Sequence, residues 1–348
     1  MLCDNRSTFE PFEDQGIVQI RPAYAELLHL LDGWGGTVRN TREGCAVSYQ
    51  GRDELVSLIR LLRGLPNGSR EEISFRIMDG ATPQQHHPWT MAEQLGPEND
   101  QCDMLNIILD QQFTSHMQPI VDRCEQIVAY EFLLRPAKNG RPFPPQKLFD
   151  TARRAGLHYF LDREARNAAI EASAKWLPSG VKRFINFLPS SISDPKKSLV
   201  QTFRVLESHH LDPCDFVFEV VETERIDDIQ HLQAIFDTYR KHGISLAMDD
   251  VGAGYSTLEQ MVLLKPDYVK IDRSLIDHCE QNSVKQQQLQ MITRTAHEFG
   301  AKVLAEGIER REEFQYCRQI GIELAQGYLF GKPAERPLKG PQSQLMLC

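Results

Sequence analysis

A repeating alternation of short apolar runs and longer amphipathic segments, beginning near residue 104, constrains the fold of this chain more than any other feature. The apolar runs are rich in β-branched residues, and the segments between them have helical periodicity. Two of these segments end at Gly243 and Gly300, and glycine often terminates helices. Strands that are apolar almost throughout are typical of a parallel sheet covered by helices. About seven such repeats favour a (β/α)8, TIM-like barrel over an open doubly wound sheet.

The first 80 residues follow a different pattern and predict a second, smaller α/β domain. Its segments PAYAELLHLLDGWGG and RDELVSLIRLLRGL have helical periodicity, whereas EEISFRIMDG is typical of a strand. We expect a polar linker at 81–103, the barrel at 104–335 and a C-terminal tail at 336–348. No cofactor motif is present in the first domain, so we expect it to regulate, to dimerise, or to bind a signal or a protein partner.

Composition excludes several classes of protein. The eight cysteines are scattered without a C-x-x-C pair, which argues against a disulfide framework and against a zinc site. The adjacent His86 and His87 lie in a polar segment and are expected to be solvated side chains. The scattered cysteines indicate a reducing, cytoplasmic compartment. No apolar run is long enough for a membrane span, and the first residues lack the features of a signal peptide. The net charge of −9 argues against binding a nucleic-acid polymer, although not against a small anionic substrate.

Polar residues interrupt the apolar runs, mostly toward the carboxyl ends of the predicted strands. In a (β/α)8 barrel these ends meet at one rim, where active sites form. A single carboxylate in a strand is usually part of an ion pair or a helix cap, but here the pattern recurs in strand after strand. The residues concerned are Glu131, Arg135, Asn186, Glu219, Glu222, Asp249, Asp250, Lys270, Asp272, Glu306, Glu309 and Gln326.

Several carboxylates at one rim would repel one another unless cations lay among them. Oxygen ligands with one asparagine, and no pattern of His or Cys, suit Mg²⁺ or Mn²⁺. Two such ions held by shared carboxylates can cleave a phosphate ester by binding both the attacking and the leaving oxygens. The alternative that the pattern leaves open is a structural network of ion pairs.

The glycines that follow Asp249 and Asp250 do not form a nucleotide-binding loop. The segment GAGYST begins like G-x-G-x-x-G, but Thr257 stands where the third glycine belongs. It is not a P-loop, because no G-K-[ST] sequence follows. The segment therefore predicts a flexible turn from a strand to a helix.

Seven blocks of sequence resemble the signature segments of EAL domains, which are bacterial phosphodiesterases of cyclic di-GMP. The resemblance covers about 104–335 and does not reach the first hundred residues. It implies that cyclic di-GMP is hydrolysed to linear pGpG with two Mg²⁺ or Mn²⁺ ions, and that the barrel forms a homodimer. The blocks are EFLLR, INFLPSSI, FEVVET, DDVGAGYSTL, PDYVKID, AEGIE and QGYLFGKP.

The resemblance also implies roles for individual residues. Asp249 would bridge the two metal ions, and Asp250 would bind the second ion and accept a proton. Lys270 would hold the attacking water or the scissile phosphate, and Glu222 would steady the Asp249–Asp250 loop. The other implied metal ligands are Glu131, Asn186, Glu219 and Glu306, and the resemblance implies that Glu131 is catalytic as well. The implied substrate-binding residues are Arg135, Gln326 and Glu309.

The chain departs from the family pattern at four positions, none of them a metal ligand. Phe132 replaces the alanine of E-A-L, and Val221 replaces a threonine. Val251 and Ala253 replace residues of the loop that links dimer packing to metal binding in the family. We therefore expect an active enzyme, and the competing hypothesis is an inactive cyclic di-GMP receptor or a protein-docking module on an EAL-like barrel.

Overall fold

The structure, a computed structural model, describes residues 15–79, 88–96, 99–189, 195–220, 229–252 and 258–338. The chain divides into two compact units, each of which is described by itself. The first comprises Met1–Phe113 and Pro136–Glu164, and the second comprises Thr114–Arg135 and Ala165–Cys348. Each unit is made of two separate segments of the chain, so the units do not define a single boundary between domains. The domain boundaries expected from the sequence therefore stay a proposal.

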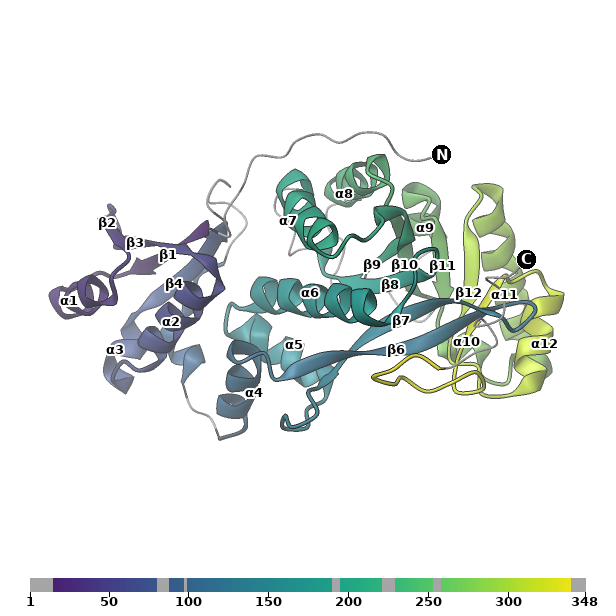
Figure 1. The fold of residues 1–348 in the computed structure, drawn as a ribbon, viewed down its shortest axis with the longest axis horizontal. Coiled ribbons are helices and arrows are strands. Elements are labelled where there is room, and N and C mark those ends of the chain that lie inside the picture. The colour runs from purple at the N-terminus through teal and green to yellow at the C-terminus, as the bar shows by residue number, and fades with distance from the viewer. Residues whose placement is uncertain are drawn as a thin grey trace. The chain divides into compact units, whose positions relative to one another are not determined.

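The first unit contains a five-stranded sheet with the order β2-β3-β1-β4-β5 (Figure 1). Strand β1 is central and pairs antiparallel with both β3 and β4. The helices predicted around residues 25 and 55 are present as α1 and α2. The strands are β1 (Gln15–Arg21), β2 (Thr37–Asn40), β3 (Cys45–Gln50), β4 (Ser74–Asp79) and β5 (Thr90–Met91), and the helices of this unit include α1 (Ala25–Trp34), α2 (Gly51–Arg63), α3 (Asn67–Glu72), η1 (Ala92–Leu95), α4 (Asn99–Leu109) and α5 (Pro145–Arg154).

Alternation along the strands gives this sheet two different faces. Val18 and Ile20 of β1 and Val47 of β3 are buried, and the apolar side of α2, with Leu58 and Leu62, is buried as well. Successive side chains of a strand point to opposite faces, so the intervening residues of β1 and β3 lie on the other face and are only partly buried. One face of the sheet therefore forms a core, and the other remains open to polar side chains.

The second unit is built on a closed eight-stranded barrel with the order β10-β11-β12-β13-β6-β7-β8-β9, as the sequence predicted (Figure 1). The strands are β6 (Phe113–Asp122), β7 (Ile127–Pro136), β8 (Lys182–Phe187), β9 (Phe216–Val220), β10 (Ser245–Val251), β11 (Tyr268–Ile271), β12 (Lys302–Ala305) and β13 (Leu324–Gln326). The remaining helices are α6 (His158–Trp176), α7 (Pro195–Ser208), η3 (Pro213–Asp215), α8 (Ile229–Lys241), α9 (Leu258–Leu264), α10 (Arg273–Ile276), η4 (Cys279–Gln281), α11 (Ser283–Glu298) and α12 (Arg311–Gln319).

The expectation of a parallel sheet throughout is wrong at one strand. Strand β6 runs antiparallel to β13 and is followed by β7 after a tight turn at Asp122–Gln126 rather than after a helix. The carboxylate of Asp122 accepts hydrogen bonds from the N–H groups of Cys124 and Gln126, which stabilises this turn. The sequence TSHMQP lacks a continuous apolar run, so pattern reasoning did not detect the strand.

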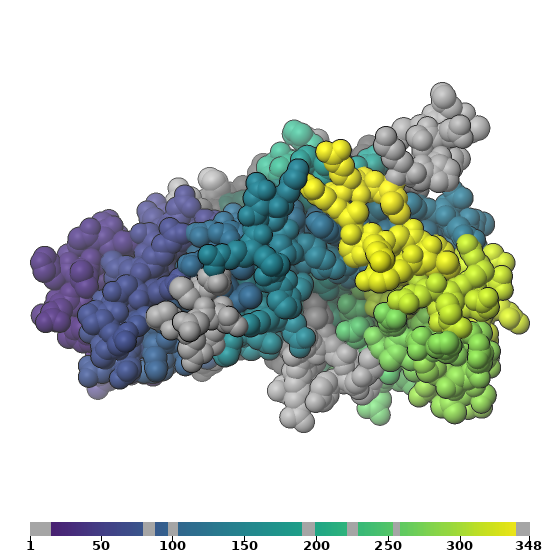
Figure 2. Space-filling view, turned by 90° about the horizontal axis from the view of Figure 1, so that it is seen from below, coloured from purple at the N-terminus to yellow at the C-terminus, as the bar shows by residue number. Residues whose placement is uncertain are grey.

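The last described segment returns to β6. Met117 and Ala334 form an antiparallel bridge with N–O distances of 2.8 and 3.0 Å. Figure 2 shows this segment, in yellow, on the surface of the barrel unit. In the described ranges, no helix is both long and apolar enough to cross a membrane.

The barrel has two apolar layers. An inner cluster takes one residue from each of the eight strands and fills the barrel interior. A larger outer cluster joins the outward-facing strand residues to the surrounding helices. The inner residues are Ile120, Ala129, Phe184, Val217, Ala247, Tyr268, Leu304 and Leu324.

Candidate active site

A polar layer lies next to the apolar inner cluster, and its residues follow a simple rule. Moving two residues along a strand keeps a side chain on the same face. Two residues beyond Phe184, Val217 and Ala247 are Asn186, Glu219 and Asp249, which therefore also point into the barrel. The same step on the other parallel strands leads to Glu131, Lys270, Glu306 and Gln326. The structure thus brings together most of the residues that the sequence singled out.

Lys270 lies at the centre of this layer and is 1% exposed. Its Nζ atom is 2.7 Å from an oxygen of Glu306 and 3.0 Å from oxygens of Glu219 and Asp249. A fourth carboxylate, Glu131, is 3.4 Å from the same nitrogen. One ammonium group therefore faces four carboxylates from four different strands or strand ends.

Glu131 has more hydrogen-bond donors than its neighbours. Its Oε2 accepts a hydrogen bond from the amide of Gln326 at 2.6 Å, and its Oε1 accepts one from the amide of Asn186 at 3.4 Å. Burial raises the pKa of Glu131, but the charge of Lys270 and these hydrogen bonds outweigh burial, so the pKa lies below its ordinary value. Glu131 is therefore held as a carboxylate.

The backbone at Asp249 and Asp250 is irregular. Strand β10 changes register against β11 between Met248 and Val251, as a bulge does. Asp250 has φ of +52°, a left-handed conformation that is uncommon outside glycine, and its N–H donates to Asp249 Oδ1 at 2.9 Å. The bulge allows two consecutive carboxylates to reach the same site, which a regular strand would place on opposite faces.

For three of the carboxylates, burial and mutual repulsion together outweigh the stabilisation that Lys270 provides. Burial raises the pKa values of Glu219, Asp249 and Glu306; Lys270 lowers them, and the neighbouring carboxylates raise them again. The net pKa of each of the three is above its ordinary value. The pKa of Lys270 is raised as well: burial lowers it, but the surrounding carboxylates more than offset burial.

The donor set fits divalent cations. Two overlapping groups of carboxylates each have ligand atoms within 4.8 Å of one another. Glu131, Glu219 and Asp249 form one group, and Asp249, Asp250 and Glu306 form the other. Within the described residues, Glu219 Oε1 is buried without a hydrogen-bond partner, as expected of an oxygen that needs a cation. The ligands are all oxygen atoms, as Mg²⁺ and Mn²⁺ prefer.

The structure places the other predicted residues outside this cluster. Glu309 is part of an ion pair with Arg273 at 2.9 Å, and both side chains are largely exposed. Arg135 lies at the end of β7, donates to the carbonyl of Leu134, and is a positive neighbour of His116. Glu222 lies outside the described residues.

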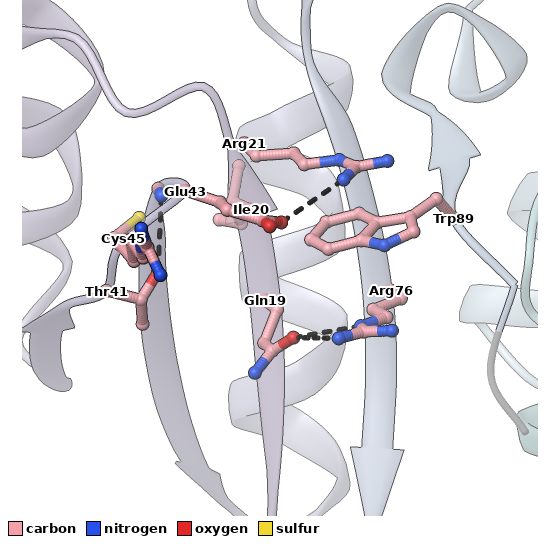
Figure 3. A pocket seen from close by; sticks show the side chains of 10 residues that line it. Gln19, Ile20, Arg21, Thr41, Glu43, Cys45, Arg76 and Trp89 are labelled. Carbon is pink, nitrogen blue, oxygen red and sulfur yellow. Dashed lines mark hydrogen bonds and ion pairs between the residues drawn. The ribbon is translucent and has the colours of Figure 1, made fainter. Parts of the chain in front are cut away.

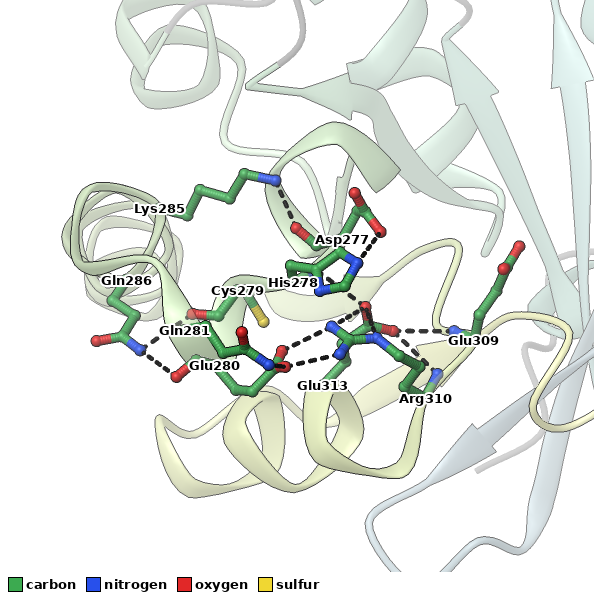
Figure 4. A network of polar contacts seen from close by, with 10 residues as sticks. All are labelled: Asp277, His278, Cys279, Glu280, Gln281, Lys285, Gln286, Glu309, Arg310 and Glu313. Carbon is green, nitrogen blue, oxygen red and sulfur yellow. Dashed lines mark hydrogen bonds and ion pairs between the residues drawn. The ribbon is translucent and has the colours of Figure 1, made fainter.

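The loop that carries Glu309 is held by a polar network (Figure 4). The carboxylate of Glu313 is 1% exposed and accepts hydrogen bonds from the N–H groups of His278, Glu309 and Arg310, each at 3.0 Å. Arg310 also pairs with Glu280 at 2.8 Å. The residues after Glu306 are therefore fixed by buried acceptors rather than by a strand.

Sequence reasoning missed one member of the polar layer. Because β6 is antiparallel, the step of two residues from Ile120 runs backward along the chain and leads to Gln118. Gln118 is buried, and its amide donates to the carbonyl of Gly331 at 3.2 Å. Gln118 could have been assigned to the polar layer from the sequence only if β6 had been recognised as an antiparallel strand.

Two of the departures from the family pattern lie in the outer apolar layer. Phe132 and Val251 are both buried among the residues that join the barrel to its helices. Neither side chain belongs to the carboxylate cluster. Val221 and Ala253 lie outside the described residues.

Comparison with known proteins identifies the family. The family model described as "EAL domain" matches residues 101–333, about two thirds of the chain. The chain belongs to the EAL domain family. It is 29% identical over 235 residues to the "Probable cyclic di-GMP phosphodiesterase PdeB" of Escherichia coli, a match that covers 66% of this chain and 45% of that protein. This EAL protein spans less than half the length of the first curated relatives that it matches.

Solved structures of EAL proteins share the barrel. A standalone EAL protein from Vibrio cholerae, crystallised in a form bound to c-di-GMP, is 31% identical, with a TM-score of 0.59 over 66% of this chain and 96% of that one. Bacillus subtilis YkuI, in complex with c-di-GMP and calcium, is 27% identical with a TM-score of 0.59, and the match covers 69% of this chain and 60% of that one.

One neighbour extends beyond the barrel. Klebsiella pneumoniae BlrP1, in a manganese and cy-diGMP complex, matches 92% of this chain and 96% of that chain with a TM-score of 0.59. The match is longer than the barrel, so it includes part of the N-terminal sheet domain. The identity is 21%, which supports a shared fold and nothing more specific.

Proposed function

We propose that this EAL protein hydrolyses cyclic di-GMP to linear pGpG, using two Mg²⁺ or Mn²⁺ ions held by the barrel carboxylates. The observation that carries the proposal is the pair of overlapping carboxylate groups that share Asp249 around the buried Lys270. Metal ions bound there would lower the pKa of a bound water and neutralise the phosphate. The names of the relatives and the c-di-GMP bound in solved EAL structures support the substrate, and the retained ligand residues support catalysis.

The protein's own residues would have distinct tasks. Glu131, Asn186, Glu219, Asp249, Asp250 and Glu306 would hold the metal ions. Lys270, kept protonated by its carboxylate neighbours, would donate a hydrogen bond to the phosphate or to the attacking oxygen and stabilise the charge that develops. Asp250, which lies within the bulge and is only partly buried, would accept a proton.

The substrate-binding roles of Arg135, Gln326 and Glu309, and the role of Glu222 in steadying the Asp249–Asp250 loop, also stay proposals. Gln326 supports Glu131 directly through its amide. Arg135 and Glu309 lie outside the cluster, where they would contact parts of the nucleotide away from the scissile phosphate.

We further propose a homodimer through the barrel and a cytoplasmic location. Sedimentation of the purified protein with and without substrate tests whether it is a dimer.

A hydrolysis assay tests the function. Purified full chain is incubated with cyclic di-GMP and either Mg²⁺ or Mn²⁺, and nucleotides are separated by chromatography. We expect pGpG with wild type and the loss of about 10³-fold or more of the rate in Glu131→Ala and Asp249→Asn. The exposed Glu312→Ala is a matched control that should keep full activity. Tight nucleotide binding without metal, with cyclic di-GMP recovered unchanged, would instead support the receptor or docking module.

A further inference from the structure

A cavity of about 230 Å³ lies on the N-terminal sheet, in the first unit (Figure 3). Three arginines line it, Arg21, Arg42 and Arg76, against one carboxylate, Glu43. The chain as a whole carries a net charge of −9, so this concentration of positive charge is opposite in sign to the overall charge of the chain. The lining is also polar, which distinguishes it from an apolar packing defect.

Strand register explains why these side chains meet. Gln19 and Arg21 lie on the face of β1 opposite to the buried Val18 and Ile20. Gln19 is the registered partner of Arg76 on β4. Trp89 directly precedes β5, whose Thr90 pairs with Phe75, so Trp89 comes alongside Arg76. The face of the sheet that is not used by the core therefore gathers the two arginines around one aromatic side chain.

The indole of Trp89 lies between two guanidinium groups. The Cζ atom of Arg21 is 3.9 Å from the ring centroid, and that of Arg76 is 4.5 Å from it. Figure 3 shows one arginine on each side of the indole. Each contact stabilises a cation by the electron-rich face of the ring. Both ring faces are occupied, so the cavity is suited to recognise charge rather than to stack a nucleobase.

Arg76 is oriented by a forked hydrogen bond. Its Nε and Nη2 atoms donate to Gln19 Oε1 at 2.8 and 2.6 Å. Burial lowers the pKa of Arg76, the charge of Arg21 lowers it further, and Glu43 acts in the opposite direction. Two like charges are therefore held near each other, and an anion bound beside them would reduce their repulsion.

The turn between β2 and β3 completes the cavity. Thr41 donates its N–H to the carbonyl of Gly44 at 2.9 Å, and Gly44 donates to Thr41 Oγ1 at 3.2 Å. A Cβ atom on Gly44 would lie 2.0 Å from the carbonyl oxygen of Ile20, so only glycine permits this close approach. The tight turn places Arg42 and Glu43 at the cavity. Glu43 pairs with Arg21 at 3.3 Å, but both side chains are exposed, so this ion pair is weak.

We propose that this arginine pocket binds a small phosphate-bearing anion. Planar guanidinium groups match phosphate oxygens in pairs, and three of them around one cavity favour a phosphate over a singly charged carboxylate. The proposal is independent of the chemistry in the barrel, since the lining residues all belong to the sheet domain.

Calorimetric titration of the full chain with sodium pyrophosphate tests the proposal. Divalent metal is first removed with a chelating resin, and ionic strength is held constant. We expect one saturable site, weakened about tenfold by Arg76→Gln or Arg42→Gln. Arg39→Gln, an exposed arginine on the neighbouring strand that does not line the cavity, is the matched control and should bind like wild type.

Glu43→Gln separates binding from folding. Among the described residues that line the pocket, it removes the one carboxylate, so we expect pyrophosphate to bind several-fold more tightly, a result that a damaged fold cannot produce. Inorganic phosphate should bind more weakly than pyrophosphate, and acetate should not compete. The absence of saturable binding, equal loss in Arg39→Gln, weaker binding in Glu43→Gln, or full competition by acetate would each overturn the proposal.

Discussion

The barrel interior and the arginine pocket collect charge in opposite ways. In the barrel, four carboxylates surround one lysine, and three of them are buried. On the N-terminal sheet, three arginines and one glutamate surround an open cavity. Buried like charges need a counter-ion to be stable, whereas exposed ones are largely screened by water. The carboxylate cluster should therefore respond strongly to the loss of a single charge, and the pocket only moderately.

Removing Lys270, the cation at the centre of the carboxylate cluster, should have the largest effect. In Lys270→Met, four carboxylates lose their common partner, so we expect a rate lower by about 10³-fold and a metal-free protein less stable by about 3–5 kcal/mol. Mn²⁺ should restore much of the stability, because a divalent ion replaces the lost charge. Denaturation curves with and without Mn²⁺ test this, and the exposed Lys302→Met is the control. Equal curves for Lys270→Met and wild type in metal-free buffer would contradict it.

Removing one buried negative charge from the cluster should increase the stability of the metal-free protein. Glu219 is fully buried, and one of its oxygens has no hydrogen-bond partner among the described residues. In metal-free buffer, Glu219→Gln should therefore stabilise the protein by about 1–3 kcal/mol, while activity with metal is lost.

Glu131→Gln is the contrasting variant, because Glu131 accepts hydrogen bonds from Gln326, Asn186 and Lys270. It should lower stability in the same buffer. Chemical denaturation of both variants measures the difference, and a loss of stability in Glu219→Gln would show that the cluster is already neutralised without metal.

Glu313 provides a buried carboxylate with a full set of donors. Burial alone would raise its pKa, but three backbone N–H groups and Arg310 lower it below the ordinary value (Figure 4). A depressed pKa adds stability above the unfolded-state pKa of about 4.3, and this stability is lost as the pH falls through the folded-state pKa. Glu313→Gln should thus cost about 1–3 kcal/mol at pH 7, with a smaller difference below about pH 4. Urea denaturation at both pH values tests this; a cost that does not change with pH would contradict it.

The smallest expected effect is the dependence of ligand affinity on salt concentration. Because the arginines of the pocket are partly exposed, their attraction for pyrophosphate should weaken several-fold between about 50 and 300 mM NaCl. Mn²⁺ binding to the buried carboxylates, measured by calorimetry on the same preparation, should change less. A steeper dependence on salt for Mn²⁺ than for pyrophosphate would reverse the comparison between the two regions.

The sequence by itself determined the barrel and most members of its polar layer. Strands buried on both sides must be apolar, so each polar residue within them stood out, and Glu219, Asp249 and Lys270 were recognisable without coordinates. The period of two along a strand then places these residues on the inward face, next to the inner apolar cluster.

Only the tertiary structure decided the features that depend on direction and register. The antiparallel course of β6 brings Gln118 into the polar layer, and the bulge in β10 turns Asp249 and Asp250 toward the same site. The pairing of Gln19 with Arg76, with Trp89 alongside, depends on residues up to 70 positions apart along the chain. Such contacts arise from strand pairing between distant segments, and local composition carries no record of which segments will pair.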